Sequence, residues 1–75
     1  MFTQLVEIVK EYVEIDERKI TNDTNLIMDL GIDSFTLSEI ACAIEGEFEI
    51  EVPETEMHRL KSVGDVISFI QARVN

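Results

Sequence analysis

The sequence contains few of the side chains from which cross-links, metal sites and catalytic dyads are built. Its 75 residues include one cysteine, Cys42, and one histidine, His58. A single cysteine cannot form an intramolecular disulfide, and these two residues are too few for a structural zinc site. Cys42 could be considered as a nucleophile, but no base can be placed beside it. An exposed helical cysteine is the simpler interpretation, so the sequence gives an enzyme and a metal site little support.

Long hydrophobic runs are also missing. No stretch approaches the ~20 consecutive apolar residues of a membrane span. The apolar residues at the N-terminus are interrupted by Glu7, Lys10 and Glu11, which a signal peptide would not contain. The sequence therefore predicts a soluble cytoplasmic protein, with any targeting segment removed before this sequence begins.

Basic residues are scarce, with 6 Lys and Arg against 16 Asp and Glu, and the net charge is −10. A chain of this charge is repelled by nucleic acid and by anionic membrane surfaces. It should favour partner proteins that carry basic patches. The alternative is that the acidic residues serve solubility alone.

The 75-residue length and the 45% hydrophobic content predict a single domain, residues 1–75, with one modest core. A first helix of three to four turns is indicated by apolar residues at helical spacing. These residues are Phe2, Leu5, Val6, Val9, Tyr12 and Val13. Ile8 falls outside this stripe, and we expect it at the edge of the buried face.

Residues 15–32 break the helical pattern, and the loop-forming cluster at 21–25 lies within them. The cluster lacks the Asp-x-Asp-x-Asp-Gly order of a calcium-binding loop, so a calcium sensor is disfavoured. A solvated linker would not carry so many large apolar residues. We therefore expect an ordered loop pinned to the core by Ile15, Ile20, Leu26, Ile27, Met28, Leu30 and Ile32.

A second helix is predicted over residues 34–48, with Asp33 as its N-cap. Its buried face should contain Leu37, Ile40, Ala41, Ile44 and Phe48. The opposite face holds Phe35, Ser38, Glu39, Cys42 and Gly46. A large aromatic residue exposed among acidic residues is informative, because such side chains are usually buried. The alternative is that Phe35 folds back against Ile32.

The remainder predicts two more helices. Residues 50–52 should form an extended connector, and Pro53 precedes a short helix over 54–60 with Met57 and Leu60 facing inward. Ser62 is placed to cap the last helix, with Asp65 three residues on as its capping-box partner. Its buried stripe should be Val63, Val66, Ile67, Ile70 and Val74. The predicted fold is an all-α, four-helix bundle with a long ordered loop between helices one and two and a short third helix.

The most informative stretch joins the loop to the second helix and reads Asp29-Leu30-Gly31-Ile32-Asp33-Ser34-Phe35. Gly31 permits a tight turn. Ser34 would occupy the first helical turn, where an anion attached to it would meet unpaired N–H groups and the positive end of the helix dipole. An isolated Asp-Ser pair is most often only a helix cap, so its meaning depends on the rest of the chain.

In this context the chain resembles the acyl carrier proteins over nearly its whole length. The resemblance is carried by the stretch just given, by Ile44-Glu45-Gly46-Glu47-Phe48 and by Val52-Pro53. It implies a carrier and not an enzyme, with 4′-phosphopantetheine attached to Ser34 beside the motif residue Asp33. A phosphopantetheinyl transferase would install this arm, and its thiol would carry acyl groups as thioesters to partner enzymes of fatty-acid or related biosynthesis. The carrier is expected to be a monomer.

The resemblance and the helical wheel also assign two groups of side chains. The expected partner-binding residues are Phe35, Glu39, Cys42, Glu45 and Glu47, which basic enzymes would contact. The expected acyl pocket is lined by Leu37, Ile44, Val52, Met57, Leu60 and Val63.

Several positions depart from the family pattern. Phe35 replaces the usual Leu, Thr36 lacks the acidic side chain of many fatty-acid carriers, and Gly46 interrupts a Glu run. Phe at this place also occurs in carriers of specialised polyketide, peptide or D-alanine pathways, which remain alternatives. A further alternative is an unmodified acidic adaptor protein.

Overall fold

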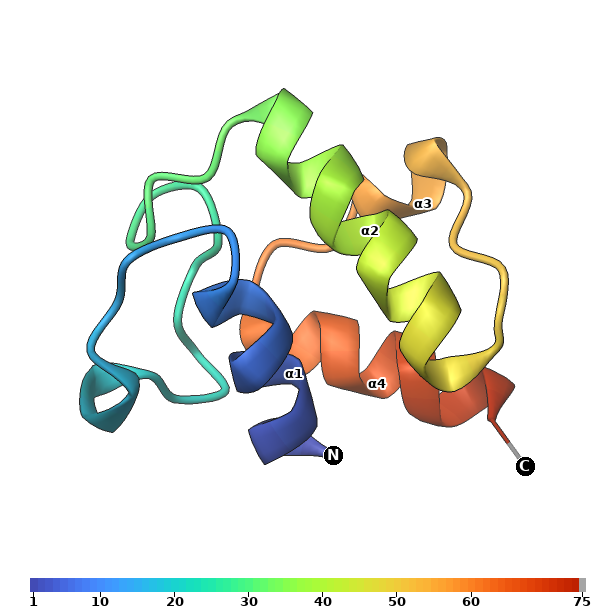
Figure 1. The fold of residues 1–75 in the computed structure, drawn as a ribbon, viewed down its shortest axis with the longest axis horizontal. Coiled ribbons are helices and arrows are strands. Elements are labelled where there is room, and N and C mark those ends of the chain that lie inside the picture. Colours follow the sequence, from blue (N-terminus) through green and yellow to red (C-terminus); the bar gives the residue numbers. More distant parts are fainter. Residues whose placement is uncertain (75) are drawn as a thin grey trace.

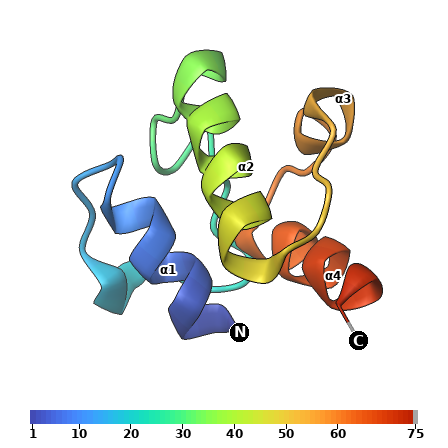
Figure 2. The same cartoon turned by 45° about the vertical axis from the view of Figure 1, so that its right-hand side comes forward.

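Helix α2 (Ser34–Phe48) lies at the centre of the fold and the other helices pack around it. The computed structural model describes residues 1–74, which measure 29 × 23 × 19 Å along the principal axes. The other segments are α1 (Phe2–Lys10), the 3₁₀-helix η1 (Glu17–Lys19), α3 (Glu54–Met57) and α4 (Val63–Arg73). In two views α1 and α3 lie on opposite sides of α2, and α4 runs below α2 (Figures 1 and 2). The predicted all-α, four-helix fold is confirmed.

Helix α1 is shorter than predicted, because it ends at Lys10 and the chain continues as a turn through Tyr12. Tyr12 is consequently exposed, although the stripe placed it on the buried face. Ile8, which falls outside the predicted stripe, is also buried and is the most exposed of the four buried residues of α1. The buried face is wider than one stripe because α2 covers one side of α1 and the long loop passes along another (Figure 1).

The loop between α1 and α2 is ordered, as predicted, and backbone hydrogen bonds tie it to the start of α4. The N–H of Leu26 donates to the Lys61 carbonyl at 2.9 Å, and the N–H of Gly64 donates to the Asn22 carbonyl at 2.8 Å. A Cβ at position 64 would lie 3.0 Å from that Asn22 oxygen, so the close approach depends on glycine. We refer to these bonds, with the bridge between Asn25 and Ser62, as the loop–α4 stitch.

The apolar residues of this loop divide into two groups. Ile20, Leu26 and Ile32 are buried, and Ile15 and Leu30 are half-buried, as expected of anchors. Ile27 and Met28 are instead 50% and 83% exposed, so the prediction that they pin the loop is wrong. Both lie in a turn that begins at Asn25, whose side-chain oxygen accepts from their two N–H groups at 3.0 and 2.8 Å. This turn holds the two side chains outward.

Helix α2 has the predicted bounds, and its buried face is as expected apart from Phe48, which is half-buried. The helix ends in an unusual way, because Glu49 adopts the left-handed conformation with φ of 55°. Few residues other than glycine and asparagine do this readily. The Glu45 carboxylate then accepts a hydrogen bond from the Val52 N–H at 2.8 Å. This bond fixes the extended connector against the last turns of α2.

Helix α3 ends at Met57, three residues before the predicted end. Beyond it, Arg59 and Leu60 donate their N–H groups to the carbonyls of Glu56 and Met57. These are i→i−3 bonds of a tight turn, which cannot continue an α-helix. Met57 is buried and Leu60 is half-buried.

The capping box of α4 is confirmed. Asp65 donates its N–H to Ser62 Oγ, and the Asp65 carboxylate accepts from the N–H groups of Ser62 and Lys61, all at 3.1 Å. These bonds lower the pKa of Asp65. Phe69, which the predicted stripe omitted, is buried with the Arg73 guanidinium 3.7 Å from the centre of its ring. None of the helices in residues 1–74 is long and apolar enough to cross a membrane.

Candidate functional site

Asp33 fixes the start of α2 immediately before Ser34. Its backbone is extended, and its side chain accepts a hydrogen bond from the Thr36 N–H at 2.8 Å. That bond lowers the pKa of Asp33, so the carboxylate remains charged at neutral pH. The predicted N-cap is confirmed, and the next residue, Ser34, is exposed in the first turn.

Two buried residues hold the exposed Ser34 in place. Ile32 is buried on the loop side and Leu37 on the helix side. Gly31, with φ of 68°, allows the chain to turn before Ile32 enters the core. A Cβ at position 31 would meet nothing within 4 Å, so the requirement for glycine there is conformational. Ser34 is therefore presented by a fixed piece of backbone.

Exposed apolar side chains lie on both sides of Ser34 in the sequence. Phe35 is 74% exposed, which excludes the alternative in which it folds back against Ile32. Met28 and Ile27 lie on the loop side, in a turn that is closed by the Asn25 N–H donating to the Asp29 carboxylate at 2.7 Å. The apolar character of these two residues predicts contact with the core, which the structure contradicts. The sign that could have corrected it is Asn25, which commonly forms such side-chain-closed turns.

The other expected partner-binding residues differ in their surroundings. Glu39, Cys42 and Glu47 are exposed on α2, as predicted. Glu45 is half-buried, and one of its carboxylate oxygens is already bonded to the Val52 N–H. Glu45 thus has a structural role that the sequence did not reveal.

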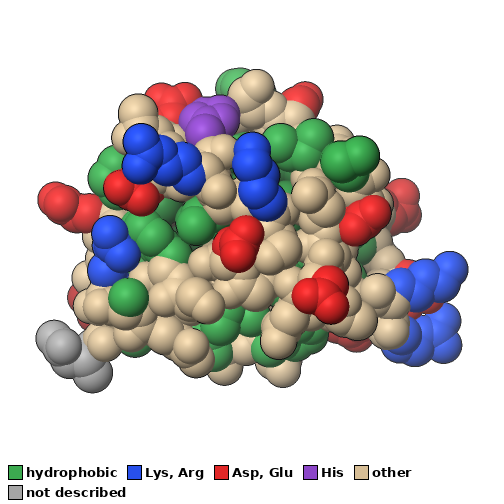
Figure 3. Space-filling view, turned by 180° about the vertical axis from the view of Figure 1, so that it is seen from behind, with side chains coloured by type: hydrophobic (Ala, Val, Ile, Leu, Met, Phe, Trp, Pro, Cys, Tyr) green, Lys and Arg blue, Asp and Glu red, His purple; other side chains and the backbone are tan. Residues whose placement is uncertain are grey.

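The surface near α2 is acidic because of an uninterrupted run in the sequence. Between Lys19 and Arg59 there is no lysine or arginine, while Asp and Glu occur ten times. Seen from behind, the molecule displays Lys and Arg on both sides of the view, with Asp and Glu among them (Figure 3). The two signs of charge are therefore unevenly distributed along the chain, with positive charge confined to its two ends.

The six residues expected to line an acyl pocket all belong to the hydrophobic core or pack against it. Leu37 and Ile44 are contributed by α2, Met57 by α3 and Val63 by α4, and all four are buried. Val52, in the connector, is buried and Leu60 is half-buried. Across the surface of this region Ser38 Oγ donates to Glu54 Oε1 at 3.2 Å, and His58 Nε2 lies 3.7 Å from the same oxygen. A polar contact therefore joins α2 to α3 above an apolar interior.

The geometry around Ser34 fits a phosphate-linked group. The hydroxyl is exposed, the side chains on either side of it do not bury it, and the start of a helix offers N–H donors and partial positive charge to a phosphate. Within residues 1–74 no three His, Cys, Asp or Glu side chains are grouped so as to hold a metal ion.

Comparison with known proteins agrees with this geometry. The family model described as "Phosphopantetheine attachment site" matches residues 3–70. An acyl carrier protein of Clostridium acetobutylicum is 38% identical over 72 residues, covering 96% of this chain and 94% of that protein. One from Thermotoga maritima is 31% identical over 74 residues, covering 99% and 91%.

A solved structure supports the fold. The solution structure of the apo doublet acyl carrier protein from prodigiosin biosynthesis superposes with a TM-score of 0.82 at 20% sequence identity. The match covers 97% of this chain and 35% of that one, so this chain spans about a third of that protein.

These matches support the role of a carrier that the resemblance implies. Acyl carrier proteins are carriers and not enzymes, and the prosthetic group of the matched domain is phosphopantetheine. The resemblance first suggested by the stretch around Ser34 is therefore confirmed over almost the full length. The chain belongs to the acyl carrier protein family, and its phosphopantetheine attachment domain extends over residues 3–70.

Proposed function

We propose that Ser34 is the residue to which 4′-phosphopantetheine is attached, and that residues 1–75 act as one carrier domain. The observation that carries this proposal is the exposed Ser34 in the first turn of α2, directly after the capping residue Asp33. When bound, the group supplies a thiol on a long arm, which forms thioesters with acyl groups. The protein's part is to present the hydroxyl to a phosphopantetheinyl transferase and to hold the attached phosphate at the helix start.

Intact mass measurement tests the attachment. The protein would be incubated with coenzyme A, magnesium and a phosphopantetheinyl transferase. The wild-type protein and Ser68→Ala, which removes an exposed serine on α4, should both gain the mass of one phosphopantetheine group. Ser34→Ala should gain nothing while keeping its helical circular dichroism, because Asp33 still caps α2. Mass gain by Ser34→Ala would place the attachment elsewhere, and no gain by the wild type would favour the unmodified adaptor.

We further propose that partner enzymes dock on the surface around Ser34. Phe35 and Met28 supply exposed apolar area, and Glu39, Cys42 and Glu47 continue the surface along α2. The free oxygen of Glu45 extends it. Partners of matching chemistry carry an apolar recess bordered by Lys and Arg. Central apolar residues usually contribute most of the binding energy at such interfaces, while exposed charges mainly raise the association rate.

Salt dependence separates these two contributions. Transfer of the acyl group to one partner enzyme should slow as salt rises, mostly through slower association, because exposed ion pairs are screened. Glu39→Lys should reduce both the low-salt rate and the salt dependence, whereas Glu11→Lys, which changes an exposed residue at the end of α1 and not on α2, should change them little. Equal effects of the two substitutions would contradict the proposed docking surface.

The apolar interior between α2 and α3 is proposed to shelter an acyl chain. Burial of the chain is favourable by ~0.8 kcal/mol for each CH₂ group removed from water. Leu37 and Met57 are large and buried, which leaves little free space and favours short chains. Met57 is also flexible enough to move aside.

Proteins loaded through Ser34 with acyl chains of increasing length test this proposed size limit. Thermal stability should reach a maximum with a short acyl chain, and Met57→Ala should shift the maximum to longer chains. Stability that rises steadily through long chains in the unmutated protein would refute the size limit.

The proposed pathway is fatty-acid or related biosynthesis, with the specialised pathways as the alternative. The support is the family membership together with the acidic α2, and Phe35 is the residue that favours the alternative. The strong negative charge opposes self-association, which supports a monomer. Mass spectrometry of the loaded protein from its native cells distinguishes the pathways, because the cargo itself is then identified.

A further inference from the structure

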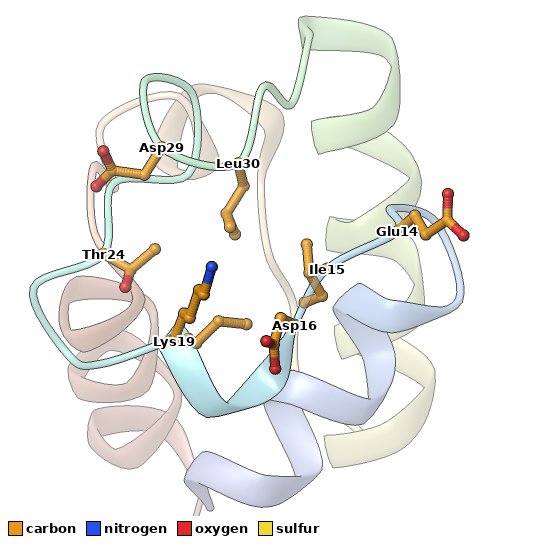
Figure 4. A pocket seen from close by; sticks show the side chains of 8 residues that line it. Glu14, Ile15, Asp16, Lys19, Thr24, Asp29 and Leu30 are labelled. Carbon is orange, nitrogen blue, oxygen red and sulfur yellow. The ribbon is translucent and has the colours of Figure 1, made fainter.

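A cavity of about 340 Å³ lies on the loop side of α2, in a part of the molecule that the proposed function leaves unused. It is open to solvent on one side and is bordered by η1 and by the part of the loop that leads to α2 (Figure 4). Ile15, Ile20 and Leu30 form apolar walls. The apolar interior proposed for acyl chains lies elsewhere, between α2 and α3. None of the residues that line this cavity belongs to the proposed acyl-chain site, so the two sites are separate.

The ammonium group of Lys19 points into this cavity (Figure 4). The neighbouring acidic side chains are directed away or already bonded. The Glu14 and Asp29 carboxylates point outward (Figure 4), and Asp29 accepts from the Asn25 N–H. Asp16 is bound at both oxygens by the Arg18 guanidinium, at 3.1 and 3.2 Å.

Lys19 differs from the nearby basic residues Lys10 and Arg18 in its ion pairing. Lys10 is paired with Glu7 and Glu17, and Arg18 with Asp16, whereas Lys19 forms no ion pair within residues 1–74. Lys19 is exposed to solvent, and its ammonium group is not held by a neighbouring carboxylate, so it can donate to a ligand that enters the cavity. A ligand that supplies an oxygen acceptor and a small apolar body would match both the cation and the walls.

A free anion would not reach this cavity easily, because the net charge of the protein is −10. Repulsion by the net charge does not prevent a ligand that is covalently tethered to the protein from reaching the cavity. A short flexible tether gives an effective concentration in the millimolar range, so that even a weak site is occupied.

The proposed attachment residue is close enough to supply such a tether. Leu30 precedes Ser34 by four residues, whose extended span is at most ~14 Å. Phosphopantetheine contains a phosphate, a pantoic acid unit, a β-alanine unit and cysteamine, and its extended length is about that of five residues, ~17 Å. Its thioester end can therefore reach the cavity from Ser34.

We propose that this loop-side cavity holds short acyl groups that carry a second carbonyl or a carboxylate in addition to the thioester carbonyl, with Lys19 donating to that additional oxygen. The proposal rests on the proposed attachment of the arm to Ser34. Two kinds of acyl group would then bind in two places. Purely apolar chains would enter between α2 and α3, and short chains with an additional oxygen would lie against Lys19.

The test uses the holo protein loaded with butyryl, acetoacetyl or succinyl groups, each verified by intact mass. Methyl and amide NMR shifts of Ile15, Ile20 and Leu30 report on the cavity, and those of Met57 report on the α2–α3 interior. Acetoacetyl and succinyl loading should move the cavity signals, and butyryl loading should move the Met57 signals. The two oxygen-bearing groups distinguish a carbonyl from a carboxylate acceptor, and movement with either one supports the proposal.

Two matched substitutions complete the test. Lys19→Met should lower occupancy of the cavity about tenfold, the loss expected for one charge-assisted hydrogen bond at a solvent-open site. Arg59→Met, which also removes one positive charge but lies just after α3 and does not line the cavity, should leave the occupancy unchanged. If oxygen-bearing cargo moves only the Met57 signals, or if Lys19→Met has no effect, the proposal is overturned. Failure of loading itself would instead contradict the attachment to Ser34, so the two failures are distinguishable.

Discussion

At its N-terminal end α2 presents side chains to solvent, whereas at its C-terminal end side chain and backbone turn back onto the protein. The first turn exposes Ser34 and Phe35 and depends on the Asp33 cap. The last turns use Glu45 to hold the Val52 N–H, and Glu49 adopts a conformation that glycine would adopt more easily. One helix thus joins a surface suited to binding with a junction suited to stability. Substitutions at its two ends should have different consequences, which four experiments can examine.

Removal of the aromatic ring at the N-terminal end should have the largest effect. Phe35→Ala should slow acyl transfer to a partner enzyme by ~30-fold or more, the equivalent of ~2 kcal/mol at the centre of an interface. Its free energy of unfolding should change by less than ~0.5 kcal/mol, because the side chain is 74% exposed. Transfer kinetics and urea denaturation measure the two quantities. Tyr12→Ala, which removes an exposed aromatic residue outside α2, is the control. If both variants slow transfer equally, Phe35 has no special role in binding partner enzymes.

At the C-terminal end the expected loss is one of stability. Glu45→Ala leaves the Val52 N–H without its acceptor, and a buried donor without a partner costs ~1–3 kcal/mol. Urea denaturation should show this loss, while Glu45→Gln, which keeps an acceptor oxygen, should recover most of it. If both variants are as stable as the wild type, the bond does not stabilise the junction.

The conformation of Glu49 predicts a gain of stability. Glu49→Gly should raise the free energy of unfolding by about 0.5–1 kcal/mol, because the left-handed conformation with φ of 55° is strained for a residue with a Cβ. The same substitution inside the helix, Glu47→Gly, should lower it by up to ~1 kcal/mol. Thermal denaturation of the two variants should therefore shift in opposite directions. A loss of stability in both would show that Glu49 is not strained.

The smallest effect concerns pH at the N-terminal end. The Thr36 N–H lowers the pKa of Asp33 below its ordinary value of 3.8. Because the pKa of Asp33 is lower in the folded than in the unfolded protein, the charged carboxylate stabilises the fold at any pH above the unfolded pKa. This stabilisation is lost as the pH falls through the pKa of the folded protein. Asp33→Asn keeps a capping side chain but cannot titrate. The difference in stability between wild type and variant should be constant near neutral pH and should shrink only in acid; a difference independent of pH throughout would disprove the role of the charge.

Helix positions were predictable from the sequence where one periodic pattern controls them, as in α2 and in the capping box of Ser62 and Asp65. The same applies to the exposure of Phe35, which follows from its place on the helical wheel. The end of α3 was not predictable, because the i→i−3 bonds after Met57 are set by tertiary packing. Ile27 and Met28 show the limit most clearly. Their composition suggests burial, but hydrogen bonds to the Asn25 side chain turn them outward.

Features formed by distant segments were out of reach of sequence reasoning. The bond between Glu45 and Val52 depends on the path of the connector, and the loop-side cavity depends on η1, which no periodic pattern indicates. The direction of Lys19 likewise depends on the fold, since its neighbours Asp16 and Arg18 bind each other.

The loop–α4 stitch also bears on the order in which the protein matures during its synthesis. The loop precedes α2 in the chain and its bonding partners follow α3, so the bonds of Leu26 and Asn22 to Lys61 and Gly64 cannot form until synthesis has passed residue 64. The backbone that leads to Ser34 is therefore not held in place before that point. A chain that stops at Arg59 should have freely exchanging amide hydrogens at Leu26 and should be a poor substrate for modification. The loop–α4 stitch would then delay attachment of the arm until the start of α4 has been made and has bonded to the loop.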